Sequence, residues 1–137
     1  MSDYVLDASV LVKWAVPEND EENTDKALEL LADYEHGKIG LLQPFHWLCE
    51  VAAVLCRTSA PTLSRKVHLL RSLEIPVAEN PMIFQSACEI AIKLDHHLFD
   101  TLYHAVALQT GLTLVTADAR YYRKASQLGH IKLLSKI

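Results

Sequence analysis

The feature that most constrains the fold is an alternation of short apolar segments with longer segments of helical periodicity. The short segments are rich in aliphatic and β-branched residues, and residues 112–116 are the clearest of them. The longer segments repeat apolar residues with a period near 3.6, most regularly over residues 81–94. Strands that alternate with helices favour a parallel sheet covered by helices on both faces. We therefore predict an α/β fold with a central parallel sheet.

The predicted elements can be placed along the chain. Strands are expected over residues 3–7, 39–42, 112–116 and 131–134, with a brief extended segment at 74–77. Helices are expected over residues 10–14, 18–35, 45–57, 62–73, 81–94, 100–108 and 118–128. Neither an internal repeat nor a linker interrupts this order, so we expect a single domain over residues 1–137.

Composition narrows the class of protein. Of the 137 residues 50% are apolar and 22% are charged, which excludes a disordered chain. No apolar run reaches the ~18 residues that a membrane span needs, and the N-terminus lacks the basic head and apolar run of a signal peptide. The odd number of cysteines, three, suits a reducing compartment. We therefore expect a cytoplasmic protein that does not associate with membranes.

The net charge of −4 argues, taken alone, against a nucleic-acid-binding protein. The charge is unevenly distributed, however, because residues 118–137 hold one acidic and five basic residues. Arg120, Arg123 and Lys124 lie in this segment, and Arg120 and Lys124 would share one helix face. These three are candidate RNA-binding residues, although a solvated helix face explains them equally well.

Four carboxylates stand out by their positions. Asp7 and Asp118 each follow a predicted strand, and Glu50 lies inside an apolar helix, where an unpaired carboxylate would be costly. Asp100 lies at the start of another helix, where a helix N-cap is the competing explanation. Ligand sites of such sheets lie outside the carboxyl ends of the strands. The four acids are therefore candidates to converge at this edge of the sheet.

Carboxylates that converge repel one another, and a divalent cation removes that conflict. A set of oxygen ligands alone suits Mg²⁺ or Mn²⁺ rather than Zn²⁺, which prefers His and Cys. Such a site can activate a water for attack on a phosphodiester and neutralise charge on the departing oxygen. The residues therefore point to metal-assisted phosphoryl hydrolysis.

The segments that carry these acids resemble the motifs of a known family. Residues 5–12 (VLDASVLV) resemble the opening motif of the PIN-domain family, and in particular of VapC-type toxins. Residues 47–55 (WLCEVAAVL) resemble the internal glutamate helix of that family. Residues 99–107 (FDTLYHAVA) and 111–118 (GLTLVTAD) resemble its third and fourth motifs. The matches follow the family order and cover essentially the whole chain.

The resemblance implies a PIN-like fold and an Mg²⁺- or Mn²⁺-dependent endoribonuclease. It further implies that VapC-type toxicity is blocked by a cognate antitoxin and that the protein forms a homodimer. Two hydroxyl residues, Ser9 and Thr116, would support the metal site. The acids implied to be both catalytic and metal-binding are Asp7, Glu50, Asp100 and Asp118.

Two alternatives to a toxin stay open at this point. One is a PIN-domain nuclease of RNA processing, and the other is a non-catalytic PIN-like binding module. The second is suggested by Ala53, because the family often has Asn three residues after the glutamate. His104 lies four residues after Asp100 and would share a helix face with it. It would then contact that acid or a substrate phosphate; the alternative is an ordinary structural histidine.

Overall fold

The computed structural model of the protein describes residues 2–19 and 21–137. Within these residues four strands, β1 (Ser2–Leu6), β2 (Ile39–Leu41), β3 (Thr113–Thr116) and β4 (Ile131–Leu133), form one sheet. The strand order is β2-β1-β3-β4 and every pairing is parallel. All four predicted strands are confirmed, with ends that differ by at most one residue.

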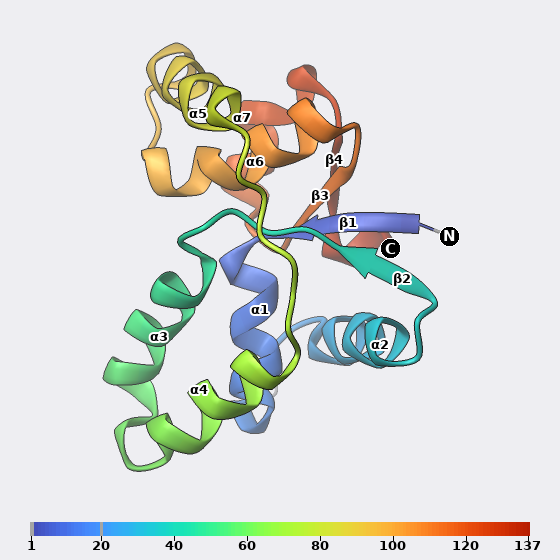
Figure 1. Cartoon of the computed structure of the whole chain (residues 1–137), viewed down its shortest axis with the longest axis vertical. Helices are drawn as coiled ribbons and strands as arrows, with labels where there is room; N and C mark the ends of the chain where they lie inside the picture. Colours follow the sequence, from blue (N-terminus) through green and yellow to red (C-terminus); the bar gives the residue numbers. More distant parts are fainter. Residues whose placement is uncertain (1, 20) are drawn as a thin grey trace.

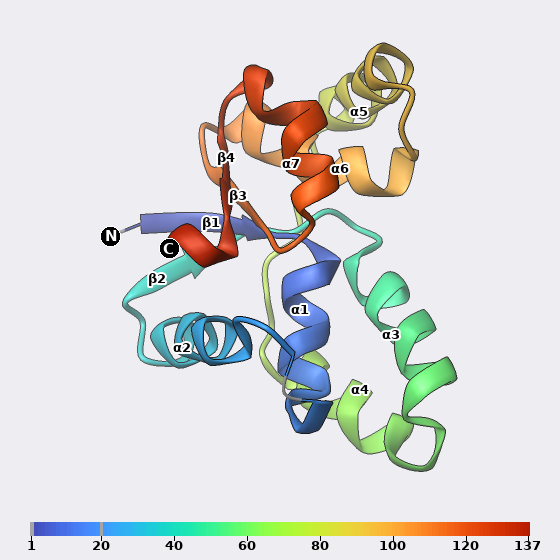
Figure 2. The same cartoon turned by 180° about the vertical axis from the view of Figure 1, so that it is seen from behind.

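Seven α-helices of the described residues cover the sheet. They are α1 (Ala8–Ala15), α2 (Thr24–Glu35), α3 (Trp47–Thr58), α4 (Leu63–Ser72), α5 (Pro81–Leu94), α6 (Leu98–Thr110) and α7 (Ala119–Ala125). Helices α1 to α4 gather on one side of the sheet, and α5 to α7 lie on the other (Figures 1 and 2). The predicted α/β architecture is therefore confirmed.

Helix α2 begins later than the sequence predicts. The helix expected from residue 18 starts at Thr24, and Pro17–Asn19 forms a separate 3₁₀ turn. Asn23 adopts a left-handed backbone conformation (φ 64°), which cannot continue a right-handed helix. Residue 20, which belongs to the predicted helix, lies outside the described residues.

On the side of β2, where the strand pairing stops at Tyr4 and Leu41, the end of β1 is held by a buried side-chain amide. The Oε1 atom of Gln43 accepts a hydrogen bond from the backbone N of Leu6 (2.8 Å), and its Nε2 atom donates to the carbonyl of Leu6 (2.8 Å). The backbone of Gln43 forms a parallel bridge with Val77, in the segment expected to be extended. Gln43 is fully buried, so these bonds fix the chain immediately before Asp7.

The strand order reverses direction between β1 and β3, because β2 lies beyond β1 on one side and β4 lies beyond β3 on the other. In parallel sheets, ligands bind outside the carboxyl ends of the strands at such a reversal. Asp7 follows β1 and Asp118 follows β3, so both acids lie at this edge.

Among the described residues, no helix combines the length and the apolar character that crossing a membrane would require.

Candidate active site

Asp7 is held in place by hydroxyl groups from two directions. Its Oδ2 atom accepts hydrogen bonds from the hydroxyls of Ser9 (2.7 Å) and Thr116 (2.9 Å). The same hydroxyl oxygens accept backbone N–H groups, Ser9 from Ala117 and Thr116 from Asp118, each at 3.0 Å. These bonds join the end of β1, the start of α1 and the end of β3, and they fix the orientation of the carboxylate.

The environment of Asp7 disfavours its charged form. The surface of the residue is partly accessible, but the atoms packed around the carboxylate remove water from it and raise its pKa to about 6. The hydroxyls of Ser9 and Thr116 oppose this shift, whereas the negative charges of Asp100 and Glu50 add to it. The structure therefore brings three of the four predicted acids within electrostatic range of one another.

Glu50 projects from α3 toward a histidine and a tyrosine. Its Oε1 atom lies 3.3 Å from Nε2 of His46, and the same nitrogen lies 2.8 Å from the carbonyl oxygen of Phe99. Burial pushes the pKa of Glu50 upward, but His46 and Tyr103 beside it outweigh this effect, so its pKa lies below the usual value. Burial and the neighbouring carboxylates raise the pKa of Tyr103. Neither Oε1 of Glu50 nor the Tyr103 hydroxyl completes a well-directed hydrogen bond.

Asp100 lies in the first turn of α6 and pairs with a histidine. The N-cap of α6 is His97, so the explanation of Asp100 as the N-cap is wrong. The Oδ2 atom of Asp100 lies 2.7 Å from Nε2 of His96 instead. The ring of His96 packs against Tyr121, with 4.9 Å between ring centroids. The side chain of Asp100 is 37% exposed and is thus open to a ligand.

Asp118 has a structural contact that the other three acids lack. It is the N-cap of α7, where its Oδ1 atom accepts a hydrogen bond from the backbone N of Tyr121 (3.1 Å). Asp118 therefore has one carboxylate oxygen already engaged in the cap of α7.

The donor chemistry of this group fits a hard divalent cation. Carboxylate oxygens are the ligands that Mg²⁺ and Mn²⁺ prefer, and the buried Oε1 atom of Glu50 lacks a hydrogen-bond partner. In the part of the chain that the structure describes, no three His, Cys, Asp or Glu side chains gather closely enough to enclose an ion. Binding of a cation would therefore require the carboxylates to turn toward it.

The candidate RNA-binding residues separate into two groups. Arg120 and Lys124 line one cavity of about 260 Å³ together with Asp95, His96 and His97. Arg123 does not line this cavity. The predicted common face of Arg120 and Lys124 thus borders the histidine that contacts Asp100.

Histidine side chains near the acids are the part of the site that the sequence analysis missed. His46 and His96 each stand four residues before an acid of the site, Glu50 and Asp100 respectively, and this repeated spacing is the signal that the sequence offers. His104 is instead structural, because it is buried between the hydroxyl of Tyr121 (Nδ1, 2.9 Å) and a backbone carbonyl (Nε2, 2.8 Å).

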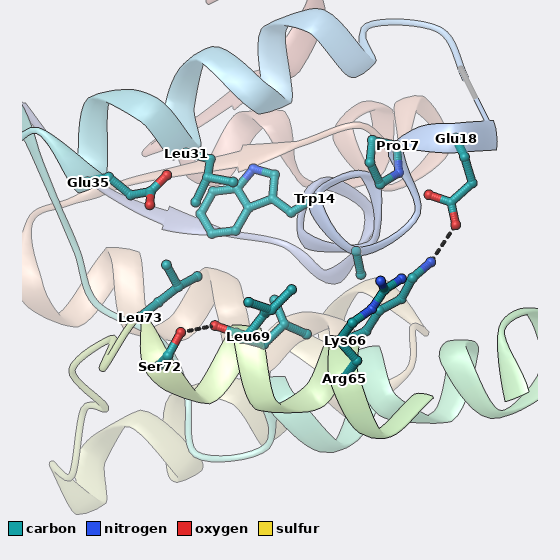
Figure 3. Close-up of a pocket in the computed structure, with 12 residues that line it drawn as sticks. Trp14, Pro17, Glu18, Leu31, Glu35, Arg65, Lys66, Leu69, Ser72 and Leu73 are labelled. Atoms are coloured by element: carbon teal, nitrogen blue, oxygen red, sulfur yellow. Dashed lines mark hydrogen bonds and ion pairs between the residues drawn. The ribbon is translucent and has the colours of Figure 1, made fainter. Parts of the chain in front are cut away.

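A second cavity, of about 400 Å³, lies between α1, α2 and α4 and contains none of the four acids. Figure 3 shows Trp14 and Leu31 across this cavity from Leu69 on α4, with the ion pair of Glu18 and Lys66 at one end. Its walls are largely apolar. This cavity is therefore separate from the candidate active site.

The sequence profile of the PIN domain family matches residues 4–127, so the chain belongs to this family. The predicted PIN fold and family are thereby confirmed, and the extension of the domain over all of residues 1–137 stays a prediction. PIN domains are generally nucleases, which makes a nuclease the broad class of function.

Two solved structures share this fold. PAE2754 from Pyrobaculum aerophilum has a TM-score of 0.68 and 22% sequence identity, and the match covers 98% of this chain and 91% of that chain. VapBC2 from Rickettsia felis, solved in complex with a DNA fragment from its promoter, has a TM-score of 0.68 and 16% sequence identity. This match covers 96% of this chain and 98% of that chain. At these identities the likeness establishes the fold. No curated protein matches the chain in sequence.

Proposed function

We propose that this PIN domain is a divalent-metal-dependent endoribonuclease. The observation that carries the proposal is the carboxylate of Asp7, whose pKa is raised to about 6, chiefly by burial and further by the negative charges of Asp100 and Glu50. A fold that buries a carboxylate within range of two others gives up stability, as is typical of sites that bind a cation. The residues proposed as catalytic and metal-binding are Asp7, Glu50, Asp100 and Asp118.

The cation proposed for this site is Mg²⁺ or Mn²⁺. When bound, it supplies Lewis-acid stabilisation of the scissile phosphate and activation of a water for attack. The protein's own contribution at Asp7 is orientation, because the hydroxyls of Ser9 and Thr116 both donate to the same carboxylate oxygen. This leaves the second oxygen of Asp7 as the proposed ligand of the cation.

Of the two histidines beside the acids, His96 supplies the same kind of support, because its Nε2 contacts Asp100 at 2.7 Å. An imidazole N–H that donates to a carboxylate limits its rotation and leaves its other oxygen free. Nε2 of His46 instead lies 2.8 Å from the carbonyl oxygen of Phe99, and Oε1 of Glu50 is left without a hydrogen bond. In this proposal His96 positions a ligand and does not contact the scissile phosphate.

The test compares wild-type protein with Asp7→Asn on single-stranded RNA, in Mg²⁺, in Mn²⁺ and in EDTA. We expect cleavage by the wild type in either ion, none in EDTA, and none by Asp7→Asn. Asp25→Asn, which removes an exposed carboxylate from the first turn of α2, is the matched control and should cleave like the wild type. Cleavage by Asp7→Asn at the wild-type rate would contradict the proposal.

We infer further that the enzyme is the toxin of a type II toxin–antitoxin pair in the cytoplasm, where it forms a homodimer and is blocked by a cognate antitoxin. The support is the fold shared with VapBC2 of Rickettsia felis over 96% of this chain. Expression of the chain alone should arrest growth, and co-expression of a small adjacent gene product should relieve the arrest. Mapping of cleaved RNA ends in the arrested cells would then identify the substrate.

The same experiments separate the two alternatives. Metal-dependent cleavage without growth arrest would favour a nuclease of RNA processing. Absence of any divalent-dependent cleavage would favour a binding module. Ala53 is exposed and lines a cavity beside Glu50, so Ala53→Asn tests whether an amide at this position raises the rate of cleavage.

A further inference from the structure

The cavity between the α5–α6 connection and α7 has the chemistry of an anion site. Its volume is about 260 Å³, and its lining includes a guanidinium and an ammonium group, from Arg120 and Lys124. Asp95 is the one carboxylate among the lining residues. The side chain of Arg120 makes no hydrogen bond or ion pair to any of the described residues. The N–H donors of its planar guanidinium group are therefore free for a ligand.

Lys124 is fixed at the rim of this cavity. Its Nζ atom donates to the backbone carbonyl of Asp95 (3.1 Å) and lies 3.2 Å from Nδ1 of His96. An ammonium group has three N–H donors and no acceptor, so Nδ1 of His96 must accept and one donor of Lys124 is left over. The cation is therefore held in position before any ligand arrives.

The same contact joins the cavity to the acidic group. Because Nδ1 of His96 accepts from Lys124, the ring proton lies on Nε2, which donates to Asp100 at 2.7 Å. A single imidazole ring thus separates the cavity from a proposed metal ligand. An anion in the cavity lies beside the reaction site and not on an unrelated surface.

We propose that this cavity binds a phosphate group of the RNA strand next to the scissile one, with Arg120 and Lys124 as its ligands. The identification of the bound nucleic acid as RNA rests on the proposed function. A guanidinium matches two phosphate oxygens at once, and an ammonium adds a compact charge. Two positive charges against one carboxylate leave the cavity net positive, which suits a single phosphodiester.

Arg71 provides a matched control on another helix. It is exposed on α4 and does not line the cavity, so Arg71→Ala removes the same charge and the same side chain outside the proposed subsite. Arg120 is equally exposed, which makes loss of folding by Arg120→Ala unexpected, and far-ultraviolet circular dichroism verifies this. The comparison of the two arginines therefore isolates the cavity.

The experiment measures binding of a short labelled single-stranded RNA in metal-free buffer, where affinity does not depend on catalysis. We expect Arg120→Ala to weaken binding about tenfold and to reduce the slope of log K against log salt by about 0.7. Arg71→Ala should weaken binding by less than about twofold. In Mg²⁺, Arg120→Ala should raise KM with little change in kcat.

Each outcome decides the proposal. Equal effects of the two arginine variants, or no RNA binding by the wild type, would overturn it. Inorganic phosphate serves as a second probe: if Arg120→Ala loses phosphate binding but keeps RNA affinity, the cavity binds a free anion and the strand assignment is wrong. If the two variants differ as expected but the wild type cleaves no RNA in any divalent ion, the subsite stands and the proposed nuclease function fails.

Discussion

The carboxylate of Asp7 lowers the stability of the folded protein at neutral pH. Folding raises its pKa from 3.8 to about 6, chiefly because burial disfavours the charged form. The free energy of unfolding is therefore highest while Asp7 is protonated, below the pKa that it has in the unfolded chain. It falls as the pH rises through the pKa that Asp7 has in the folded protein. The loss therefore falls between pH 3.8 and about 6.

Asp7→Asn should therefore stabilise the protein while it abolishes cleavage. We expect a gain of about 1–3 kcal/mol at neutral pH, which disappears below about pH 4, because Asn carries no charge to desolvate. Urea unfolding in metal-free buffers across this range measures the difference. Asp25→Asn should show no such pH-dependent gain, and a constant offset for Asp7→Asn would contradict the assigned pKa.

Gln43 presents the opposite case, a polar residue that stabilises the sheet. Gln43→Leu would leave the buried N–H and carbonyl of Leu6 without partners and should cost about 2–4 kcal/mol in the free energy of unfolding. Gln85→Leu, on the exposed side of α5, is the control and should cost much less. Equal losses, measured by chemical denaturation, would show that the amide does not hold β1.

Site residues that directly follow a strand can be predicted from the sequence, whereas the residues that hold the strand in place cannot. Asp7 can be predicted as a site residue because its position after an apolar strand is visible locally. Gln43 cannot, because its bonds to Leu6 cross 37 residues and no local pattern marks them. The pairs of His46 with Glu50 and of His96 with Asp100 lie between these cases, since a spacing of four along one segment suggests contact without proving it.

Among the helices, α5 is stabilised at its N-terminus by the side chain of its N-cap residue, Asn80. The side chain of Asn80 accepts a hydrogen bond from the backbone N of Met82 (2.9 Å), and Pro81 occupies the first helical position. We expect Asn80→Ala to lower stability by about 1 kcal/mol and Asn80→Asp to lower it far less. Thermal unfolding measures both changes. Cleavage should be unaffected, because α5 carries none of the proposed acids, and equal losses in both variants would argue against a capping role.

The strands could be predicted to within one residue, whereas the starts of four helices, α1, α2, α3 and α6, differ from the prediction by two residues or more. Apolar β-branched runs bounded by turn residues leave little freedom in placing a strand. The start of α2 depends on the left-handed conformation of Asn23, and that of α6 on His97 acting as N-cap. Neither residue interrupts the helical pattern of the sequence, so backbone geometry decides where each helix begins.

For the whole molecule, a bound cation should act as a stabilising ligand. Mg²⁺ or Mn²⁺ at 100 times its dissociation constant is expected to add about 2.7 kcal/mol to the stability of the wild type. The corresponding rise in Tm should be much smaller for Asp7→Asn and unchanged for Asp25→Asn. Differential scanning fluorimetry with and without EDTA provides the measurement. An equal rise in all three proteins would place the ion elsewhere.

The pairing of β1 with β3 also determines when the site comes into existence. Asp7 and Thr116 meet across 109 residues of sequence, and Asp100 lies far from the N-terminal strand as well. Asp7 leaves the ribosome well before its hydroxyl partner on β3, which follows 109 residues later. A nascent chain therefore lacks the assembled acidic group until β3 has emerged. For an enzyme proposed to cut RNA, this order keeps the partly made chain inactive while it is still attached to the ribosome and its message.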